Sequence, residues 1–155
     1  MPMLRMLKVL ALCAAFTVMS AAQAQDTPSK AEQVLKYRKA VYQVILWNFG
    51  PMSAMAQGKA PYDATEFAKR AERVAAVTPM LMDAYPDESK GVADSRLKPE
   101  MWGNRADFDT KLKTLVDRSA NLAAVGKAGD FERSKAAFFE TANACKSCHD
   151  KYRKD

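Results

Sequence analysis

The sequence is poor in the residues that build sheets and tight loops. Its 155 residues include six glycines and seven prolines, and no long run of β-branched residues occurs. Alanine is abundant, so the composition favours helices over strands. No segment recurs with a period of roughly 20 to 50 residues, which excludes a solenoid, and the length fits a single domain.

A strong excess of charge of one sign is also missing. The formal net charge is +6, and the basic residues are interspersed with acidic ones along the chain. A nucleic-acid-binding protein would show a basic stripe, which this sequence lacks. We therefore expect no nucleic-acid partner. The small positive excess should keep the protein soluble and weakly favour its association with an acidic partner.

The one long apolar segment lies at the N-terminus. It follows Arg5 and Lys8 and leads to Ala22-Gln23-Ala24, a small-x-small cleavage pattern. We predict a signal peptide over residues 1–24 and export to the periplasm. Loss of Arg5 and Lys8 leaves residues 25–155 with a formal charge of +4. The apolar run is shorter than the ~20 residues that span a bilayer, so a membrane anchor is the weaker interpretation. No other segment is apolar enough, and no membrane association is expected after cleavage.

Apolar residues recur at three- and four-residue steps in four segments, which predicts four helices. The predicted helices cover residues 28–58, residues 63–81, residues 104 to 126 or 129, and residues 130–155. Because the connections are mostly short, consecutive helices should run antiparallel. The sequence thus predicts an all-α fold, in which residues 25–155 form one antiparallel four-helix bundle.

Residues with special backbone preferences mark the ends of these helices. Side chains that can cap a helix stand at each predicted start. They are Thr27, Asp63, Asn104 and Asp130. Pro51 should bend the first helix near its end, and Pro79 should kink or end the second, because proline lacks the backbone donor. Residues 83–103 show no steady period and are predicted to form the longest loop.

Cysteine and histidine are scarce but concentrated near the C-terminus. Cys145, Cys148 and His149 form a C-x-x-C-H pattern, the signature of covalent haem attachment. On a helix, positions i, i+3 and i+4 share one face, so all three side chains point the same way. Each thiol can add to one haem vinyl group, and His149 can bind the iron from the same side. We predict one covalently bound haem c, with His149 as an axial ligand.

Other uses of this motif fit the sequence less well. A disulfide between Cys145 and Cys148 is the structural alternative. A thioredoxin-like site places its C-x-x-C at the N-terminus of a helix within a βαβ unit, whereas this motif closes the last predicted helix. A zinc site would need further ligands, and no other histidine or cysteine remains after signal cleavage.

The presence of a single histidine limits how the chain can coordinate the iron. His149 is the only histidine in the chain, so the chain cannot supply a second one. The opposite face of the iron must therefore be open, or bound by Met, Lys, Tyr or a small molecule.

A C-x-x-C-H motif at the extreme C-terminus, after three helices, resembles class II c-type cytochromes and specifically the cytochrome c′ family. Further motifs in the same order carry this resemblance over essentially all of residues 25–155. They are Tyr37-Arg38, Phe49-Gly50-Pro51-Met52, residues 58–63, residues 99–102 and residues 145–153.

The resemblance implies properties that the residues alone do not. Members of the family are four-helix bundles in the periplasm, commonly homodimers, with high-spin, five-coordinate haem iron. The sixth site is closed off by an apolar pocket. Members bind nitric oxide and carbon monoxide, and can exchange electrons.

The resemblance also assigns residues to the distal side of the haem. Tyr42 takes the position over the vacant iron face, where other members have Leu, Met or Phe. A Met at this position ligates the iron in the related low-spin cytochromes c-556. A protonated phenol is a poor ligand, so Tyr42 indicates an open sixth site. Met82 and Tyr85 fall where members line the distal pocket.

Four charged residues complete the predicted site. Arg38 lies one turn before Tyr42 and is expected to pair with a haem propionate, with Lys39 as a weaker neighbour. Arg153 follows His149 by four residues and is expected near the proximal pocket. Glu100 is expected at the haem edge.

The leading hypothesis is a diatomic-gas-binding cytochrome, with nitric oxide as the favoured ligand and steric control by Tyr42. It is a binding protein rather than an enzyme, since no acid–base set is present. Alternatives are a six-coordinate electron carrier of the c-556 kind, and an enzyme such as a nitric oxide reductase or weak peroxidase. Val44 and Trp47 lie off the buried stripe and predict a homodimer through the first two helices. The sequence does not identify a redox partner protein.

Overall fold

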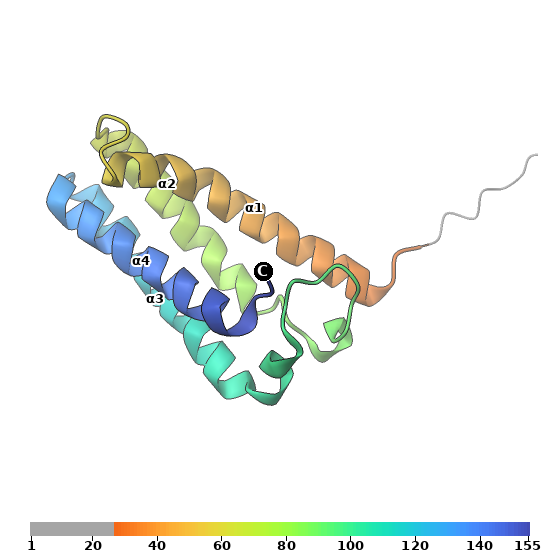
Figure 1. Cartoon of the computed structure of the whole chain (residues 1–155). Coiled ribbons are helices and arrows are strands. Elements are labelled where there is room, and N and C mark those ends of the chain that lie inside the picture. The colour runs from red at the N-terminus through yellow and green to blue at the C-terminus, as the bar shows by residue number, and fades with distance from the viewer. Residues whose placement is uncertain (1–26) are drawn as a thin grey trace, which may run out of the picture.

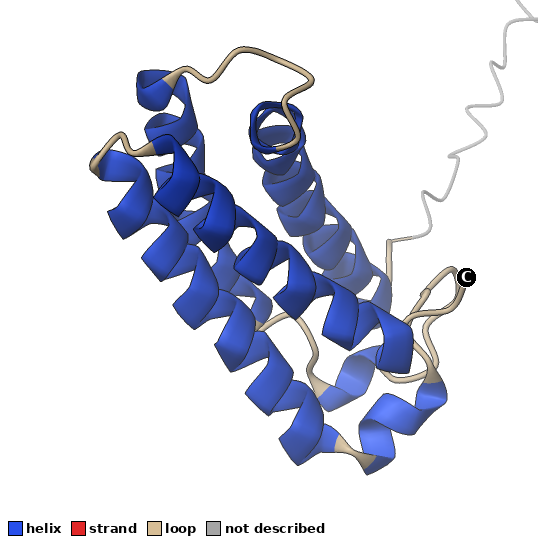
Figure 2. Cartoon of the chain, turned by 60° about the vertical axis from the view of Figure 1, so that its left-hand side comes forward, coloured by secondary structure: helices blue, strands red, loops and turns tan. Residues whose placement is uncertain are grey.

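The computed structural model describes residues 27–155, and the predicted signal peptide lies outside this range. Four antiparallel α-helices form a bundle, as predicted (Figure 1). Their bounds are α1 Lys30–Ala56, α2 Ala64–Val77, α3 Arg105–Lys127 and α4 Phe131–Tyr152. No strand occurs among the described residues (Figure 2). None of their helices combines the length and apolar character needed to cross a bilayer.

Side-chain caps define most of the helix starts. Asp63 and Asp130 accept hydrogen bonds from backbone amides three residues on, as expected for N-caps. The N-cap of α1 is Ser29 rather than the predicted Thr27, because Ser29 forms a capping box with Glu32. Asn104 holds the N-cap position of α3, but its side chain donates to the carbonyl of Glu100 instead of capping.

The segment between α2 and α3 contains more structure than its sequence predicts. The second helix becomes 3₁₀ at η1 Thr78–Leu81, where Pro79 removes a backbone donor. Two further 3₁₀ turns follow, η2 Asp87–Ser89 and η3 Pro99–Gly103. Between them, residues 96–98 pair with the end of α4, since the amide of Lys98 donates to the carbonyl of Tyr152 over 2.8 Å. The long connection is therefore fixed beside the C-terminus (Figure 1).

The apolar stripes of α2 and α3 form a large part of the core. Every residue predicted on these two stripes is buried. They are Phe67, Ala71, Val74, Thr78 and Leu81 in the second predicted helix, and Phe108, Leu112, Leu115, Ser119 and Leu122 in the third. Packing is extensive between α1 and α2, α2 and α3, and α3 and α4, but sparse between α1 and α4. The bundle is thus open along one side.

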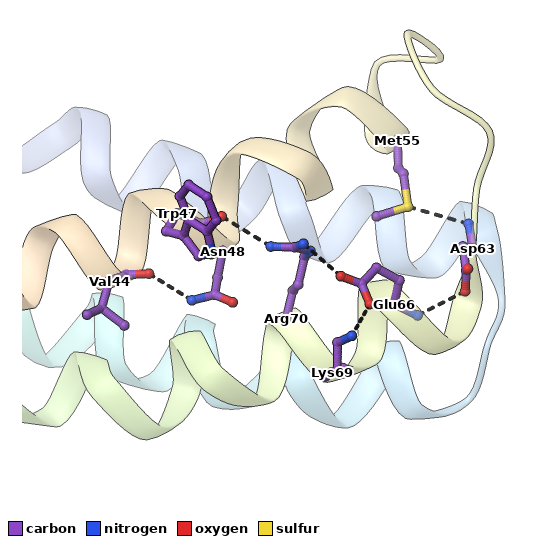
Figure 3. Close-up of polar contacts among 8 residues, drawn as sticks. All are labelled: Val44, Trp47, Asn48, Met55, Asp63, Glu66, Lys69 and Arg70. Atoms are coloured by element: carbon purple, nitrogen blue, oxygen red, sulfur yellow. Dashed lines mark hydrogen bonds and ion pairs between the residues drawn. The ribbon is translucent and has the colours of Figure 1, made fainter.

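Pro51 lies inside α1, and the helix continues past it to Ala56. Proline has no backbone N–H, so the carbonyl of Trp47, one turn earlier, lacks its helical partner. Nη1 of Arg70 on α2 donates to this carbonyl over 3.2 Å (Figure 3). Nη2 of Arg70 also forms an ion pair of 2.7 Å with Glu66. One arginine therefore joins α2 to the interrupted turn of α1.

We expect Arg70→Met to lower the free energy of unfolding by about 1–2 kcal/mol, because the carbonyl of Trp47 would lose a charged donor. In a Pro51→Ala background the new amide can serve this carbonyl, so the same substitution should be less destabilising. Urea unfolding of the four haem-loaded proteins in this cycle measures the difference. Glu66→Gln is the control, since loss of a surface ion pair alone should matter little. An equal effect of Arg70→Met in both backgrounds would contradict the assignment.

Candidate functional site

The C-x-x-C-H motif occupies the last two turns of α4. Cys145 and Cys148 are free thiols, partly buried, and His149 follows them at the exposed edge. All three line one cavity of about 560 Å³. Of the residues that the apolar period predicts on the inner face of this helix, Phe138 and Tyr152 are buried and His149 is exposed, and the others are half-buried, namely Phe131, Lys135, Ala142 and Cys145. The helix brings the three groups to one wall, as their spacing requires.

The cavity lies along the open side of the bundle. Side chains of α1 and α4 line it, together with residues 94–97 of the long connection and with Phe108 and Leu115 of α3. The lining is mainly apolar, with Leu35, Ile45, Leu46 and Phe49 on the α1 side. Its volume is that of a typical cofactor pocket. Two unpaired thiols and an imidazole on one wall of such a pocket fit a covalently attached haem.

Burial of the thiols argues against redox chemistry by the cysteines. Burial raises the pKa of Cys145, and raises that of Cys148 to about 11. A reactive C-x-x-C site needs the opposite, a pKa lowered by a helix N-terminus or neighbouring cations. Nor is there a cluster of three or more His, Cys, Asp or Glu residues that could hold a metal ion within residues 27–155.

Arg153 lies next to the predicted iron ligand. Its Nη1 is 3.4 Å from Nδ1 of His149. Burial and then the charge of Arg153 lower the pKa of His149, which favours the neutral imidazole that binds metals. Metal-bound histidines usually donate their second nitrogen to a carbonyl or carboxylate. A guanidinium offers no acceptor, so Arg153 cannot raise the basicity of His149 in this way.

Tyr42 projects into the cavity from α1, opposite the attachment wall. Its hydroxyl is 2.8 Å from that of Tyr85, which follows η1 and also lines the cavity. Burial and the neighbouring Tyr85 raise the pKa of Tyr42 well above its ordinary value. The phenol therefore stays protonated.

A sequence model of the family described as Cytochrome C' matches residues 33–153, nearly all of the described structure. The chain belongs to the cytochrome c′ family. Cytochromes c′ carry one covalently bound haem c, so haem c is the cofactor of this chain, as its motif predicts.

Individual cytochromes c′ match over all or nearly all of their length. The chain is 37% identical to that of Rubrivivax gelatinosus over 125 residues, which cover 80% of this chain and 96% of the relative. The solved cytochrome c prime from Shewanella frigidimarina matches with a TM-score of 0.78 and 36% identity, covering 83% of this chain and 100% of that one. A nitric oxide complex of a mutant cytochrome c prime from Alcaligenes xylosoxidans matches with a TM-score of 0.75 and 31% identity, with coverage of 83% and 100%.

Arg38 is more deeply buried in this cytochrome c′ than a solvated arginine would be, with 5% of its surface exposed. Its Nε donates to the carbonyl of Ala84 and its Nη2 to Ser89, both over 2.9 Å. Nη1 makes only a long contact, 3.5 Å, with Ser95. None of the ion pairs among the described residues includes Arg38. Of the three guanidinium nitrogens, Nη1 is therefore the one with the weakest contact.

The remaining candidates separate into two groups. Lys39 and Arg153 are among the residues that line the cavity. Glu100 lies exposed on η3 and is not among the lining residues. Met82 is exposed and also lies outside the lining. Of the predicted distal residues, Tyr42 and Tyr85 therefore line the cavity and Met82 does not.

Sequence reasoning missed the part of the wall that comes from the long connection. Asp94, Ser95, Arg96 and Leu97 line the cavity, although no apolar period marks them. One sequence feature indicated this segment weakly. Arg38 lies on the predicted buried stripe of the first helix, and a buried arginine needs hydrogen-bond acceptors from outside its own helix.

We expect the double variant Cys145→Ala, Cys148→Ala to retain no covalent haem, because both thiols that can form thioethers are gone. Each single variant should keep at most one bond. Mass spectrometry of protein denatured after periplasmic expression counts the attached haem. Ser147→Ala, inside the same motif, is the matched control and should keep the full haem mass. Covalent haem in the double variant would contradict the assignment.

Proposed function

We propose that this protein is a periplasmic monohaem cytochrome c′ with high-spin, five-coordinate iron, which binds nitric oxide and carbon monoxide at a restricted distal site and can transfer electrons. The haem supplies a vacant coordination position and one-electron exchange. One observation carries the proposal. Within the described residues, no methionine and no histidine other than His149 lines the cavity.

Tyr42 supports an open rather than a filled sixth site. A tyrosine binds iron well as a phenolate, and the raised pKa of Tyr42 keeps it neutral. The rings of Tyr42 and Phe49 both line the cavity from α1. Phe49 stacks on Phe138 of α4, with ring centroids 4.4 Å apart. We infer that these rings exclude water and restrict the site to small ligands. The nitric oxide complex of the Alcaligenes relative supports gas binding of this kind.

The charged residues of the cavity have roles at its edge. Arg38, through Nη1, and Lys39 are proposed to face the haem propionates, since a buried guanidinium without a carboxylate is unfavourable. Arg153 is proposed to remain beside His149 on the proximal side. Glu100 lies outside the cavity lining, so its place at the haem edge stays a prediction from the family resemblance.

The alternative is a six-coordinate, low-spin electron carrier of the c-556 kind. It would need an internal ligand, and Lys39 and Tyr42 are the lining residues of suitable type. Lys39 is exposed, and Tyr42 is a neutral phenol. Neither favours coordination. We also propose that the protein is not an enzyme, because its only histidine is the predicted iron ligand and none remains for peroxidase-type acid–base chemistry.

Export is supported by the N-terminal pattern of Arg5 and Lys8, an apolar stretch, and Ala22-Gln23-Ala24. N-terminal sequencing of the haem-loaded protein would show whether it begins at Gln25.

We expect the ferrous protein to give a high-spin absorption spectrum that changes on addition of nitric oxide, because no side chain fills the sixth position. Absorption of periplasmically expressed protein, ferric and ferrous, measures this. Tyr42→Met, which offers a thioether at the same place, is the informative variant and should shift the spectrum toward low spin. Tyr42→Phe is its matched control and should stay high-spin. A low-spin wild-type spectrum indifferent to the gas would favour the electron carrier instead.

A homodimer through α1 and α2 is proposed from the exposed apolar surface of this face. Trp47 is 75% exposed and Val44 is 45% exposed, one turn apart on α1 beside Arg70 of α2 (Figure 3). Tyr37 and Met80 extend the exposed apolar surface toward η1, where the hydroxyl of Tyr37 donates to the carbonyl of Met80. Such a patch can be covered by the same patch of a second copy.

We expect the wild-type holoprotein to sediment as a dimer at micromolar concentration, and Trp47→Glu to weaken the dimer at least about tenfold, since a carboxylate would be buried at the interface. Phe139→Glu removes an exposed apolar ring from α4 and is the control that should leave the dimer intact. Sedimentation of a monomeric wild-type protein would refute the proposed dimer.

A further inference from the structure

The last residue of α4 and the two residues after it pair with the long connection between α2 and α3. Residues 96–98 run antiparallel to residues 152–154, and we call this element the basic pairing. The amide of Lys154 donates to the carbonyl of Arg96 over 2.7 Å, and Nη2 of Arg96 donates to the carbonyl of Lys154 over 3.2 Å. These bonds hold two cationic residues opposite each other.

The basic pairing concentrates positive charge that no carboxylate neutralises. Four of its six residues are basic, namely Arg96, Lys98, Arg153 and Lys154. None of the four belongs to an ion pair among the described residues. The acidic residue closest in sequence to α4's last turn, Asp150, is paired with Lys146 instead. Like charges opposite each other in such a pairing are destabilising, and an anionic partner would offset this cost.

The basic pairing lies at the mouth of the cavity. Arg96 and Arg153 both line the cavity and are both exposed, so they stand at its rim. Nη1 of Arg153 is 3.4 Å from Nδ1 of His149, which places this charge beside the predicted iron ligand. Leu46 of α1 also lines the cavity, although 62% of its surface is exposed. An exposed apolar side chain with polar groups around it is a composition that protein-binding surfaces share.

The cations of the basic pairing differ in position from those proposed to face the haem propionates. Arg38 is buried, so a molecule outside the protein cannot reach it. Lys98 and Lys154 are not among the residues that line the cavity, and Lys154 is exposed. Their charges are therefore directed to the surroundings of the cavity rather than to its contents.

We propose that the basic pairing is the docking surface for a small electron-donor protein with an acidic face, which reduces the haem through this end of the cavity. The inference rests on the electron exchange of the proposed function. One electron leaves the reduced cofactor of the donor and converts ferric haem to ferrous haem, and no bond is made or broken. Four cations spread over two paired segments match an extended negative surface better than a single small anion. Opposite charges raise the rate of encounter and orient the donor toward the cavity mouth.

Stopped-flow reduction of the ferric holoprotein by flavodoxin hydroquinone, an acidic one-electron donor, tests the inference. The double variant Lys98→Gln, Lys154→Gln removes two charges but leaves the backbone bonds of the basic pairing in place. It should slow the second-order reduction about three- to tenfold at low ionic strength. The difference should shrink at ~0.5 M salt, where exposed charges are screened.

The double variant Lys59→Gln, Arg133→Gln is the matched control. It removes the same charge from two exposed residues, one in the connection between α1 and α2 and one in the first turn of α4. Both places lie at the other end of the bundle (Figure 1). This variant should slow reduction by flavodoxin less than about twofold. The neutral semiquinone of lumiflavin is the second reductant, and its rate should be the same in all three proteins, because an uncharged molecule is not steered.

Three kinetic results would overturn the inference. They are an unchanged flavodoxin rate in the Lys98, Lys154 variant, an equal effect of the control variant, which would mean that net charge alone acts, and an equal slowing with lumiflavin, which would place the defect at the haem. Binding to phosphatidylglycerol vesicles that the Lys98, Lys154 variant loses, with its flavodoxin rate unchanged, would assign the surface to a membrane instead. A ferric holoprotein that neither reductant reduces would refute the electron exchange of the proposed function itself.

Discussion

The three groups of the attachment motif constrain the whole bundle, because they hold a flat macrocycle against one wall of one helix. Cys145, Cys148 and His149 share a face of α4, and that face cannot also pack on a neighbouring helix. The consequence is visible in the packing, which is sparse between α1 and α4 and extensive between the other neighbours. The fold accommodates its cofactor by leaving one of four helix–helix interfaces incomplete.

Because α1 and α4 pack sparsely, most of the stability of the bundle must come from the α1–α2, α2–α3 and α3–α4 interfaces. Where α2 and α3 meet, Phe67, Val74, Phe108 and Leu122 are almost inaccessible to solvent. A polar contact with α2 also stabilises α1, because Arg70 donates to the carbonyl of Trp47, which Pro51 leaves without a helical partner. α1 can therefore hold its place as a cavity wall while resting mainly on α2.

Regular periodicity explains why some parts of this structure could be predicted and others could not. The stripe from Phe108 to Leu122 has a steady helical period, and each of its predicted residues is buried. The motif at Cys145 needs only local helix geometry, so its placement in the cavity also followed from spacing. Residues 94–97 carry no period, because their position depends on pairing with the C-terminus, a contact between segments distant in sequence. Local choices among equivalent caps, such as Ser29 over Thr27, were likewise beyond the sequence pattern.

Arg38 joins the cofactor site to the long connection between α2 and α3. Two of its nitrogens are committed to Ala84 and Ser89, while Nη1 has only a 3.5 Å contact. These demands are compatible because a guanidinium directs its donors to different sides. Burial already lowers the pKa of Arg38, which is the sign of a cation that needs a counter-charge. A haem propionate at Nη1 would supply this charge, so the same contact that anchors the cofactor would stabilise the loop. Attachment of haem at α4 and order in the connection before η3 would then be energetically coupled through one side chain of α1.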